Sequence, residues 1–528
     1  MTARVLITDP IAADGVQLLE QHFQVDTRVG LKGEELLGAL ADYDALIVRS
    51  ETRVTAEVIR AGTKLQIIGR AGVGVDNIDV NAATERGIVV VNAPTGNTIS
   101  AAELAFGLML SMARNIPQAH GSLKQGQWRR NEFVGVELRG KTLGVVGLGR
   151  VGSELARRAA IFEMKVVAFD PFISEAHARN LGAEIGTLED VLKRSDFISV
   201  HTPLTDATKS LIGPEEMALC KPGVRFINAA RGGIIDEQAL LDAVESGRVA
   251  GAAVDVFTEE PIDPANPLLK SDRIIVTPHL GASTEEAQTN VAVDVAEEVV
   301  AVLQGRAARY AVNLPRVSAE TMKATGPYLP VAGICGNVAT QLSEGQLNEV
   351  HVSYEGDIAE HDVSALKAAV VGGLLKSVSE ERVTPVNANL VAQHRGMRIL
   401  EEKGPARENF ANLITVEART SGGKTVVAGT LRRGLPHIVQ VDGYWLDLQV
   451  GSAPYLLFCE NEDRPGRIGA VGSLLGEADI NIAFMQVGRD HPRGMAMMVL
   501  GLDEPIQEQQ RLAIQAIPGV KSLKQVKL

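Results

Sequence analysis

The feature that most constrains the fold is a glycine run deep in the 528-residue chain, Gly147-Leu148-Gly149-Arg150-Val151-Gly152. The apolar segment 142–146 precedes the run, and residues 153–161, which have helical spacing, follow it. The glycines therefore fall on a strand-to-helix turn, where backbone N–H groups bind the pyrophosphate of a dinucleotide. The next apolar segment, 165–169, ends at Asp170, roughly 20 positions beyond the run, where an acidic residue accepts hydrogen bonds from the adenosine ribose. The alternative is a structural turn that binds no ligand. It does not explain why a strand, the glycine run, a helix and an acidic residue follow one another at these spacings.

Asp170 also indicates which dinucleotide binds. Its carboxylate would repel the 2′-phosphate of NADP, and Pro171 and Phe172 follow it instead of an arginine that could bind that phosphate. The sequence therefore predicts NAD as the cofactor.

Composition excludes several other classes of protein. A net charge of −13 argues against nucleic acid as a partner, because neutralising phosphates needs clustered Lys and Arg residues. The three cysteines, Cys220, Cys335 and Cys459, are far apart and form no CxxC pair or zinc-type spacing, so we expect buried, reduced thiols and no metal site. The first residues read as a strand and not a signal peptide, and no apolar run reaches about 18 residues. We expect a cytoplasmic protein that binds no membrane.

The chain is too long for one core and suggests three or four domains. Strand and helix patterns alternate over residues 1–97 and again from 142 to 276, which is typical of parallel sheets covered by helices. A helix at 100–114 is apolar on more than one face, so we expect it to be buried in a domain or a dimer interface. Another long helix is expected at 284–303.

The last third of the chain has a different pattern. From about residue 315 to 452, a helix at 363–375 is followed by β-rich segments, and no catalytic constellation is visible there. Residues 455–526 read as βαββαβ, which predicts a ferredoxin-like fold.

Three polar residues, Arg231, Glu260 and His279, lie just beyond strands, where open parallel sheets bind their ligands. Each has an ordinary alternative as an exposed arginine, a surface acid or a structural histidine. Together they supply what oxidation of a 2-hydroxy acid needs: a guanidinium for the carboxylate, an imidazole for the hydroxyl proton, and a carboxylate to orient the imidazole. The other strand-end histidine, His201, is expected to line the cofactor site.

The chain resembles the D-isomer-specific 2-hydroxyacid dehydrogenases over residues 1 to about 315. The resemblance is carried by the glycine run with Asp170 and by the segments 201–204 (HTPL), 230–233 (ARGG), 255–261 (DVFTEEP) and 278–282 (PHLGA). It implies that Arg231, Glu260 and His279 are catalytic. It also implies an α/β fold of two doubly wound parallel-sheet domains, with a Rossmann NAD-binding domain (98–284) inserted in a flavodoxin-like substrate-binding domain (1–97 and 285–315). The implied cofactor contacts are Gly147, Gly149, Arg150, Val151, Gly152, Asp170, His201, Thr202, Pro203, Ala229, Ala230, Arg231, Asp255, His279, Gly281 and Ala282.

Within that family, residues 70–79 and 92–97 resemble members that oxidise 3-phospho-D-glycerate in the first step of phosphorylated serine biosynthesis. The substrate would then carry a phosphate and a carboxylate. The implied substrate contacts are Arg49, Gly74, Arg231 and His279. Arg130, which follows Trp128, would reach a partner's site as in related dimers, or else be a solvated surface charge. A homodimer or homotetramer is expected.

The C-terminal segments agree with this branch of the family. Residues 316–452 resemble the α+β intervening domain of its long form, and residues 454–528 resemble an ACT regulatory domain. ACT domains of this branch bind L-serine at a subunit interface, which implies Asn461, Asp463 and Asn481 here. The match departs at position 461, where relatives often have His or Tyr, and the loop 442–445 lacks the basic residues that some long forms use for a second anionic effector.

Two alternatives stay open at this point. The chain could reduce another 2-oxo acid, such as glyoxylate, hydroxypyruvate or 2-oxoglutarate, or it could be an NAD-sensing binding protein that shares the fold.

Overall fold

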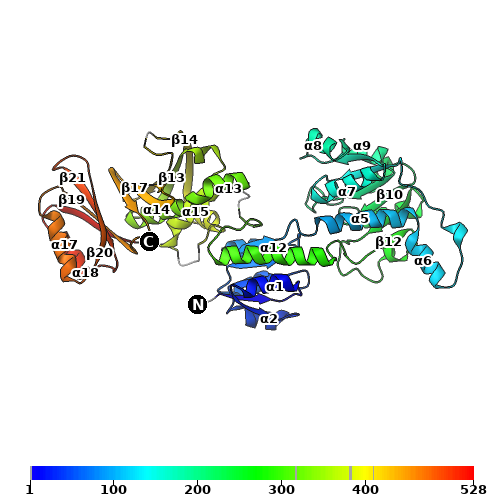
Figure 1. Ribbon diagram of the computed structural model, residues 1–528, viewed down its shortest axis with the longest axis horizontal. Helices are drawn as coiled ribbons and strands as arrows, with labels where there is room; N and C mark the ends of the chain where they lie inside the picture. The colour runs from blue at the N-terminus through cyan, green and yellow to red at the C-terminus, as the bar shows by residue number, and fades with distance from the viewer. Residues whose placement is uncertain (1–2, 315–317, 380–382, 408) are drawn as a thin grey trace.

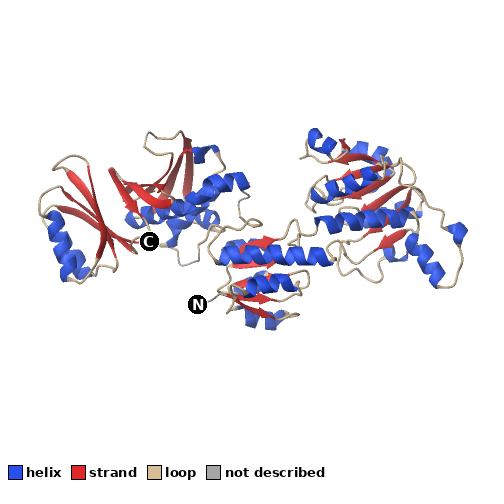
Figure 2. Ribbon diagram, viewed as in Figure 1, coloured by secondary structure: helices blue, strands red, loops and turns tan. Residues whose placement is uncertain are grey.

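The computed structural model describes residues 3–314, 318–379, 383–407 and 409–528, and within them the strands form four sheets (Figures 1 and 2). Two sheets are entirely parallel, as predicted for an α/β chain, and two are mixed or antiparallel. The predicted fold class is confirmed.

The first sheet is five-stranded, in the order β2-β1-β3-β4-β5. Its strands are β1 (Arg4–Ile7), β2 (Gln24–Thr27), β3 (Ala45–Val48), β4 (Ile67–Arg70) and β5 (Val89–Asn92), and its helices are α1 (Ala13–Glu20), α2 (Gly33–Leu40), α3 (Ala56–Ala61) and α4 (Val80–Glu85). Every residue of β3 is buried, because helices cover both faces of the sheet. Strand β4 ends at Arg70.

A segment distant in sequence completes this domain. Helix α12 (Glu285–Leu303) is capped by the preceding residue, Thr284, whose hydroxyl accepts a hydrogen bond from the Ala287 N–H. Its Val291, Val295 and Val299 recur every four residues and share one buried cluster with the first sheet. Figure 1 shows α12 lying over this sheet, next to α1.

Between these two segments the chain builds a seven-stranded parallel sheet, ordered β12-β11-β10-β9-β6-β7-β8. The strands are β6 (Thr142–Val146), β7 (Lys165–Phe169), β8 (Ala183–Ile185), β9 (Phe197–Val200), β10 (Val224–Asn228), β11 (Val249–Val254) and β12 (Ile274–Val276). The helices are α5 (Thr98–Ala113), α6 (Ile116–Lys124), α7 (Arg150–Ile161), α8 (Glu175–Asn180), α9 (Leu188–Arg194), α10 (Pro214–Leu219) and α11 (Glu237–Glu245). Strand order reverses between β6 and β9, and doubly wound sheets bind ligands at the carboxyl ends of their strands at such a point. The apolar helix predicted at 100–114 is α5, packed on α7.

The third sheet has six strands in the order β14-β13-β15-β16-β17-β18. They are β13 (Leu347–Gly356), β14 (Arg398–Gly404), β15 (Asn412–Thr420), β16 (Gly423–Arg432), β17 (Leu435–Val441) and β18 (Tyr444–Gln449), accompanied by α13 (Ala319–Thr325), α14 (Leu329–Leu342), α15 (Ser364–Lys376) and α16 (Ala388–His394). Helices α14 and α15 lie so close together that a side chain at Gly336 or Gly373 would collide with the backbone of the other helix. The core lies between these helices and the sheet.

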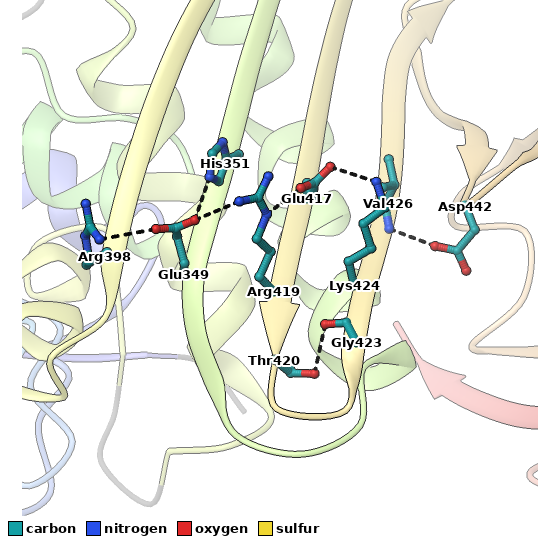
Figure 3. Close-up of polar contacts among 10 residues, drawn as sticks. All are labelled: Glu349, His351, Arg398, Glu417, Arg419, Thr420, Gly423, Lys424, Val426 and Asp442. Atoms are coloured by element: carbon teal, nitrogen blue, oxygen red, sulfur yellow. Dashed lines mark hydrogen bonds and ion pairs between the residues drawn. The ribbon is translucent and has the colours of Figure 1, made fainter.

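Charged side chains on strands β13 to β16 pair with one another (Figure 3). The Glu349 carboxylate lies 2.8 Å from His351 Nε2, 3.1 Å from Arg419 Nη1 and 3.6 Å from Arg398 Nη1. Arg419 also donates to Glu417 at 2.7 Å. Both arginines therefore already have carboxylate partners, and we assign this network to the strand surface and not to a ligand site.

The fourth sheet, ordered β20-β21-β19-β22, confirms the predicted βαββαβ pattern. Its elements are β19 (Tyr455–Glu462), α17 (Arg467–Glu477), β20 (Ile482–Arg489), β21 (Met495–Leu502), α18 (Glu508–Gln515) and β22 (Val520–Lys527). The helices lie on one face of this sheet (Figure 1), while Phe458, Val499 and Val526 share a buried cluster with Val331 and Val338 of α14. One core thus joins the two C-terminal sheets.

Candidate active site

The glycine turn after β6 has the geometry of a pyrophosphate cradle. Gly147 has φ +95°, and a Cβ on it would lie 2.8 Å from the His201 carbonyl oxygen. A Cβ on Gly152 would collide with the Gly147 carbonyl oxygen. Helix α7 starts at Arg150 with no side chain capping its N-terminus, and Val151 lies in its first turn. Its first N–H groups therefore face a turn in which Gly147 and Gly152 leave no room for a side chain.

Asp170, which follows β7, is fixed beside this turn. One carboxylate oxygen accepts from the Leu148 N–H at 2.9 Å and the other accepts from the Phe172 N–H at 2.9 Å. Each oxygen keeps a further lone pair. The carboxylate can therefore accept the ribose hydroxyls that the sequence assigns to it.

Two polar atoms near the cradle are buried and have no hydrogen-bond partner among the described residues: Nδ1 of His201 and Oγ1 of Thr202. The other ring nitrogen of His201 lies 2.8 Å from the Ser199 hydroxyl. Burial lowers the pKa of His201 to about 4, so its ring is neutral near pH 7. Unpaired buried polar atoms are rare, and here they fit a polar ligand such as a dinucleotide.

His279 and Glu260 form the pair that the sequence predicted. His279 has φ +54°, and its Nδ1 lies 2.7 Å from one carboxylate oxygen of Glu260. The other oxygen of Glu260 accepts from the Phe257 N–H at 3.0 Å. Burial opposes the charge of Glu260, but these hydrogen bonds and the charges of His279 and Arg231 outweigh it, so the pKa of Glu260 is lowered. With 46% of the His279 side chain exposed, a substrate can reach its ring.

Asp255, at the end of β11, holds the loop that carries His279. Its carboxylate accepts hydrogen bonds from the Thr277 hydroxyl and from the N–H groups of Leu280 and Gly281, at 2.6, 2.8 and 3.1 Å. Burial raises the pKa of Asp255, although these hydrogen bonds oppose the rise. This positioning role was not predicted; the signal for it was a strand-end aspartate close in sequence to Glu260. The contacts of Asp255, Gly281 and Ala282 with the cofactor stay predictions.

Arg231, in the domain of the seven-stranded sheet, lies against residues of the domain of the five-stranded sheet. It follows β10 and the predicted cofactor residues Ala229 and Ala230, and its Nη1 donates to the Ala230 carbonyl at 2.7 Å. Its Nε lies 3.7 Å from the Asp76 carboxylate, and a Cβ on Gly74 would lie 2.5 Å from its Nη2. The predicted substrate residues Gly74 and Arg231 therefore meet.

Arg49 follows β3 closely and lies at the carboxyl end of that strand of the five-stranded sheet. Its N–H donates to the buried Asp9 at 2.6 Å, and its carbonyl accepts from the Asn77 side chain at 2.9 Å. The structure describes no hydrogen bond or ion pair for its guanidinium. Asp9 was not predicted, because its role depends on a contact between two separate strands.

Two other predicted positions lie apart from these residues. Pro203 is exposed in the loop after β9, where its carbonyl accepts from the Thr208 hydroxyl at 2.6 Å. Arg130 is exposed after α6, near Trp128, and no contact described for it reaches the residues above. Its contact with a partner's site stays a prediction.

The three predicted effector residues are not together within one chain. Asn461 pairs with Ala496 of β21, at the level of Arg489, whereas Asn481 precedes Ile482 at the opposite end of the sheet. Asn481 donates to Asp503 at 2.6 Å. Asp463 accepts from the Arg493 N–H at 3.1 Å and from Arg489 at 3.3 Å, which lowers the pKa of Asp463. The Oδ1 of Asn461 is buried without a partner among the described residues.

Within the described ranges, no group of three or more His, Cys, Asp or Glu side chains is arranged to hold a metal ion. The cysteines Cys220, Cys335 and Cys459 are buried free thiols, as predicted. No helix in the part of the chain that the structure describes is long and apolar enough to cross a membrane.

Comparison with known proteins agrees with this architecture. Residues 106–281 match the NAD binding domain of D-isomer specific 2-hydroxyacid dehydrogenases, residues 324–442 the D-3-phosphoglycerate dehydrogenase intervening domain, and residues 455–518 the ACT domain. These matches confirm the predicted family and its NAD-binding domain.

Individual relatives extend the similarity to the whole chain. The D-3-phosphoglycerate dehydrogenase of Methanocaldococcus jannaschii is 44% identical over 99% of this chain and 100% of its own length, and that of Bacillus subtilis is 43% identical over 99% of each. A crystal structure of D-lactate dehydrogenase from Aquifex aeolicus, complexed with NAD and lactic acid, covers 57% of this chain and 96% of its own, with 27% identity and a TM-score of 0.51. The chain belongs to the D-3-phosphoglycerate dehydrogenase family.

Proposed function

We propose that this chain oxidises 3-phospho-D-glycerate to 3-phosphohydroxypyruvate with NAD. The observation that carries the proposal is the His279–Glu260 pair at 2.7 Å, close enough to Arg231 for its charge to help lower the pKa of Glu260. The printed names of relatives matched over their full length supply the substrate.

His279 is proposed as the base. Because the ionised Glu260 can only accept a hydrogen bond, it holds the proton on Nδ1 and leaves Nε2 free to take the proton of the C2 hydroxyl. The Glu260 carboxylate then stabilises the imidazolium. When bound, NAD supplies the acceptor for the hydride that leaves C2. The residues that would hold NAD are those of the glycine turn together with Asp170, His201 and Thr202.

Arginines are proposed to bind the two anionic groups of the substrate. The planar fork of Arg231 matches a carboxylate, and the backbone at Gly74 lies against it. Arg49 is proposed for the phosphate, since its backbone is fixed by Asp9 and Asn77 while its guanidinium has no described partner.

The domain limits proposed for this enzyme are 1–97 with 285–315 for the substrate, 98–284 for NAD, 316–452 for the intervening domain and 454–528 for the ACT domain. The packing of α12 on the first sheet supports the first of these.

Steady-state kinetics test the proposal. We expect kcat/KM for 3-phosphohydroxypyruvate to exceed that for hydroxypyruvate, glyoxylate and 2-oxoglutarate. Equal values would favour a broader 2-hydroxyacid dehydrogenase. NAD binding without turnover on any of them would instead favour an NAD-sensing protein.

L-Serine is proposed as a feedback effector of a homodimer or homotetramer. Asn461 and Asn481 lie at opposite ends of one ACT sheet, so a site that uses both needs two copies of the chain. The buried, unpaired Oδ1 of Asn461 supports a polar ligand there. A serine titration of 3-phosphohydroxypyruvate reduction tests the effector, and sedimentation of the same sample tests the oligomeric state.

A further inference from the structure

The loop that carries Glu260 joins β11 to β12, and most of its residues are exposed. In the described part of the chain, the hydrogen bonds that lead from residues 258–266 to residues outside the segment 257–270 end at two side chains, His279 and Glu237. The first of these is the proposed base. The second lies on α11 and has no role in the site described above.

Glu237 is the first residue of α11, but its carboxylate binds the loop and not its own helix. One oxygen accepts hydrogen bonds from the Thr258 N–H and hydroxyl, at 2.6 and 2.7 Å, and the other accepts from the Asn266 side chain at 3.4 Å. The helix already has a cap, because the Asp236 carboxylate accepts from the Ala239 N–H at 2.8 Å. An acidic residue in a first helical turn commonly stabilises the helix itself. Here its hydrogen bonds hold the two ends of a loop.

The start of the same loop packs on the turn that carries Arg231. A Cβ on Gly232 would collide with the Phe257 carbonyl oxygen, so the two backbones are in direct contact. Phe257 and Ile234 belong to one buried cluster. Glu237 lies three residues beyond Ile234, and it therefore holds the loop from a support that is itself anchored in the core.

We propose that Glu237 is a positioning residue of the dehydrogenase, which keeps the Glu260 carboxylate within hydrogen-bond distance of His279. This inference rests on the proposed function. The Phe257 N–H fixes one oxygen of Glu260 at 3.0 Å, and the next residue, Thr258, donates twice to Glu237. Consecutive residues of the loop thus hold the two carboxylates. Releasing Thr258 frees the backbone that orients Glu260, and His279 then loses the carboxylate that stabilises its protonated form.

A double-mutant cycle in the full chain tests the proposal, because a residue that acts only through Glu260 has no effect once that carboxylate is removed. We would measure kcat/KM for 3-phospho-D-glycerate and the melting temperature of the wild type, Glu237→Ala, Glu260→Gln and the double variant. We expect Glu237→Ala to lower kcat/KM by about 5- to 30-fold, at most the effect of removing the charge of Glu260. The double variant should match Glu260→Gln within about twofold. Glu245→Ala, at the exposed end of α11, is the matched control.

Thr258→Val provides the test if Glu237→Ala melts at a lower temperature. It removes one donor to Glu237 and keeps the shape of the side chain, so a loss of about two- to fivefold is expected, and only while Glu260 is present. Losses that multiply in the double variants would show that Glu237 only supports the fold, and wild-type turnover by Glu237→Ala would exclude the role. If the wild type did not oxidise 3-phospho-D-glycerate, the proposed function itself would fail, which is a different outcome from multiplying losses in an active enzyme.

Discussion

Replacing Glu260 by Gln removes the charge that holds the proposed base and leaves the shape of the side chain. The carboxylate lies 2.7 Å from Nδ1 of His279, and the two side chains are 36% and 46% exposed. Opposite charges about 4 Å apart interact by roughly 1 kcal/mol in water and roughly 4 kcal/mol near a protein surface. For this half-exposed pair we take about 2 kcal/mol, which corresponds to a fall in kcat/KM of about 30-fold.

The amide adds a second effect in the same direction. It can donate to Nδ1, which would favour the tautomer with a proton on Nε2, where the substrate proton has to go. The fall can therefore exceed 30-fold, whereas NAD affinity is expected to stay unchanged because Glu260 is not among the predicted cofactor contacts.

The assay is the initial rate of NADH formation from 3-phospho-D-glycerate, with NAD titration and thermal melting of the same samples. Glu259→Gln is the matched control, because Glu259 is the exposed neighbour for which no contact is described. A Glu260→Gln variant that turns over at the rate of Glu259→Gln would refute the role given to this carboxylate. A variant that loses NAD binding along with turnover would place Glu260 in the fold of the crevice instead.

Two further predictions concern other parts of the chain. Asn481→Ala is expected to abolish inhibition by serine with the dehydrogenase rate preserved, and persistent inhibition in a serine titration would place the effector elsewhere; Gln515→Ala on α18 is the control. His201 has its pKa lowered from 6.5 to about 4, so between these values the unfolded chain binds a proton that the folded chain does not, and stability falls as pH falls. Urea unfolding of the wild type and His201→Asn should show a shallower loss between pH 6.5 and 4 in the variant, and identical pH dependence would contradict the burial of this ring.

The local part of the site could be predicted from the sequence because its signals are local. The glycine turn, Asp170 and the strand-end positions of Arg231, Glu260 and His279 each follow an apolar segment, and a parallel sheet gathers such positions at one edge. The His279–Glu260 contact followed from this placement.

The features of the fold and the site that were not predicted depend on contacts between segments distant in sequence. Asp9 acts on a loop about 40 residues away, as its hydrogen bonds to Arg49, Glu51 and Thr52 show, and no periodicity carries that information. Arg231 lies beside the loop that follows β4, and no local pattern predicts this contact between two domains. The parallel pairing of β13 with β14 joins strands separated by two helices, so it was not predicted either.

The central claim is that His279 accepts the hydroxyl proton of 3-phospho-D-glycerate in an NAD-dependent oxidation. The most direct measurement compares NADH formation from this substrate by the wild type and by His279→Ala, with the Kd for NAD measured on both. We predict turnover by the wild type and a kcat lower by about 10²- to 10⁴-fold in the variant, which still binds NAD. Equal turnover by the two proteins, or no NADH formed by the wild type, would contradict it.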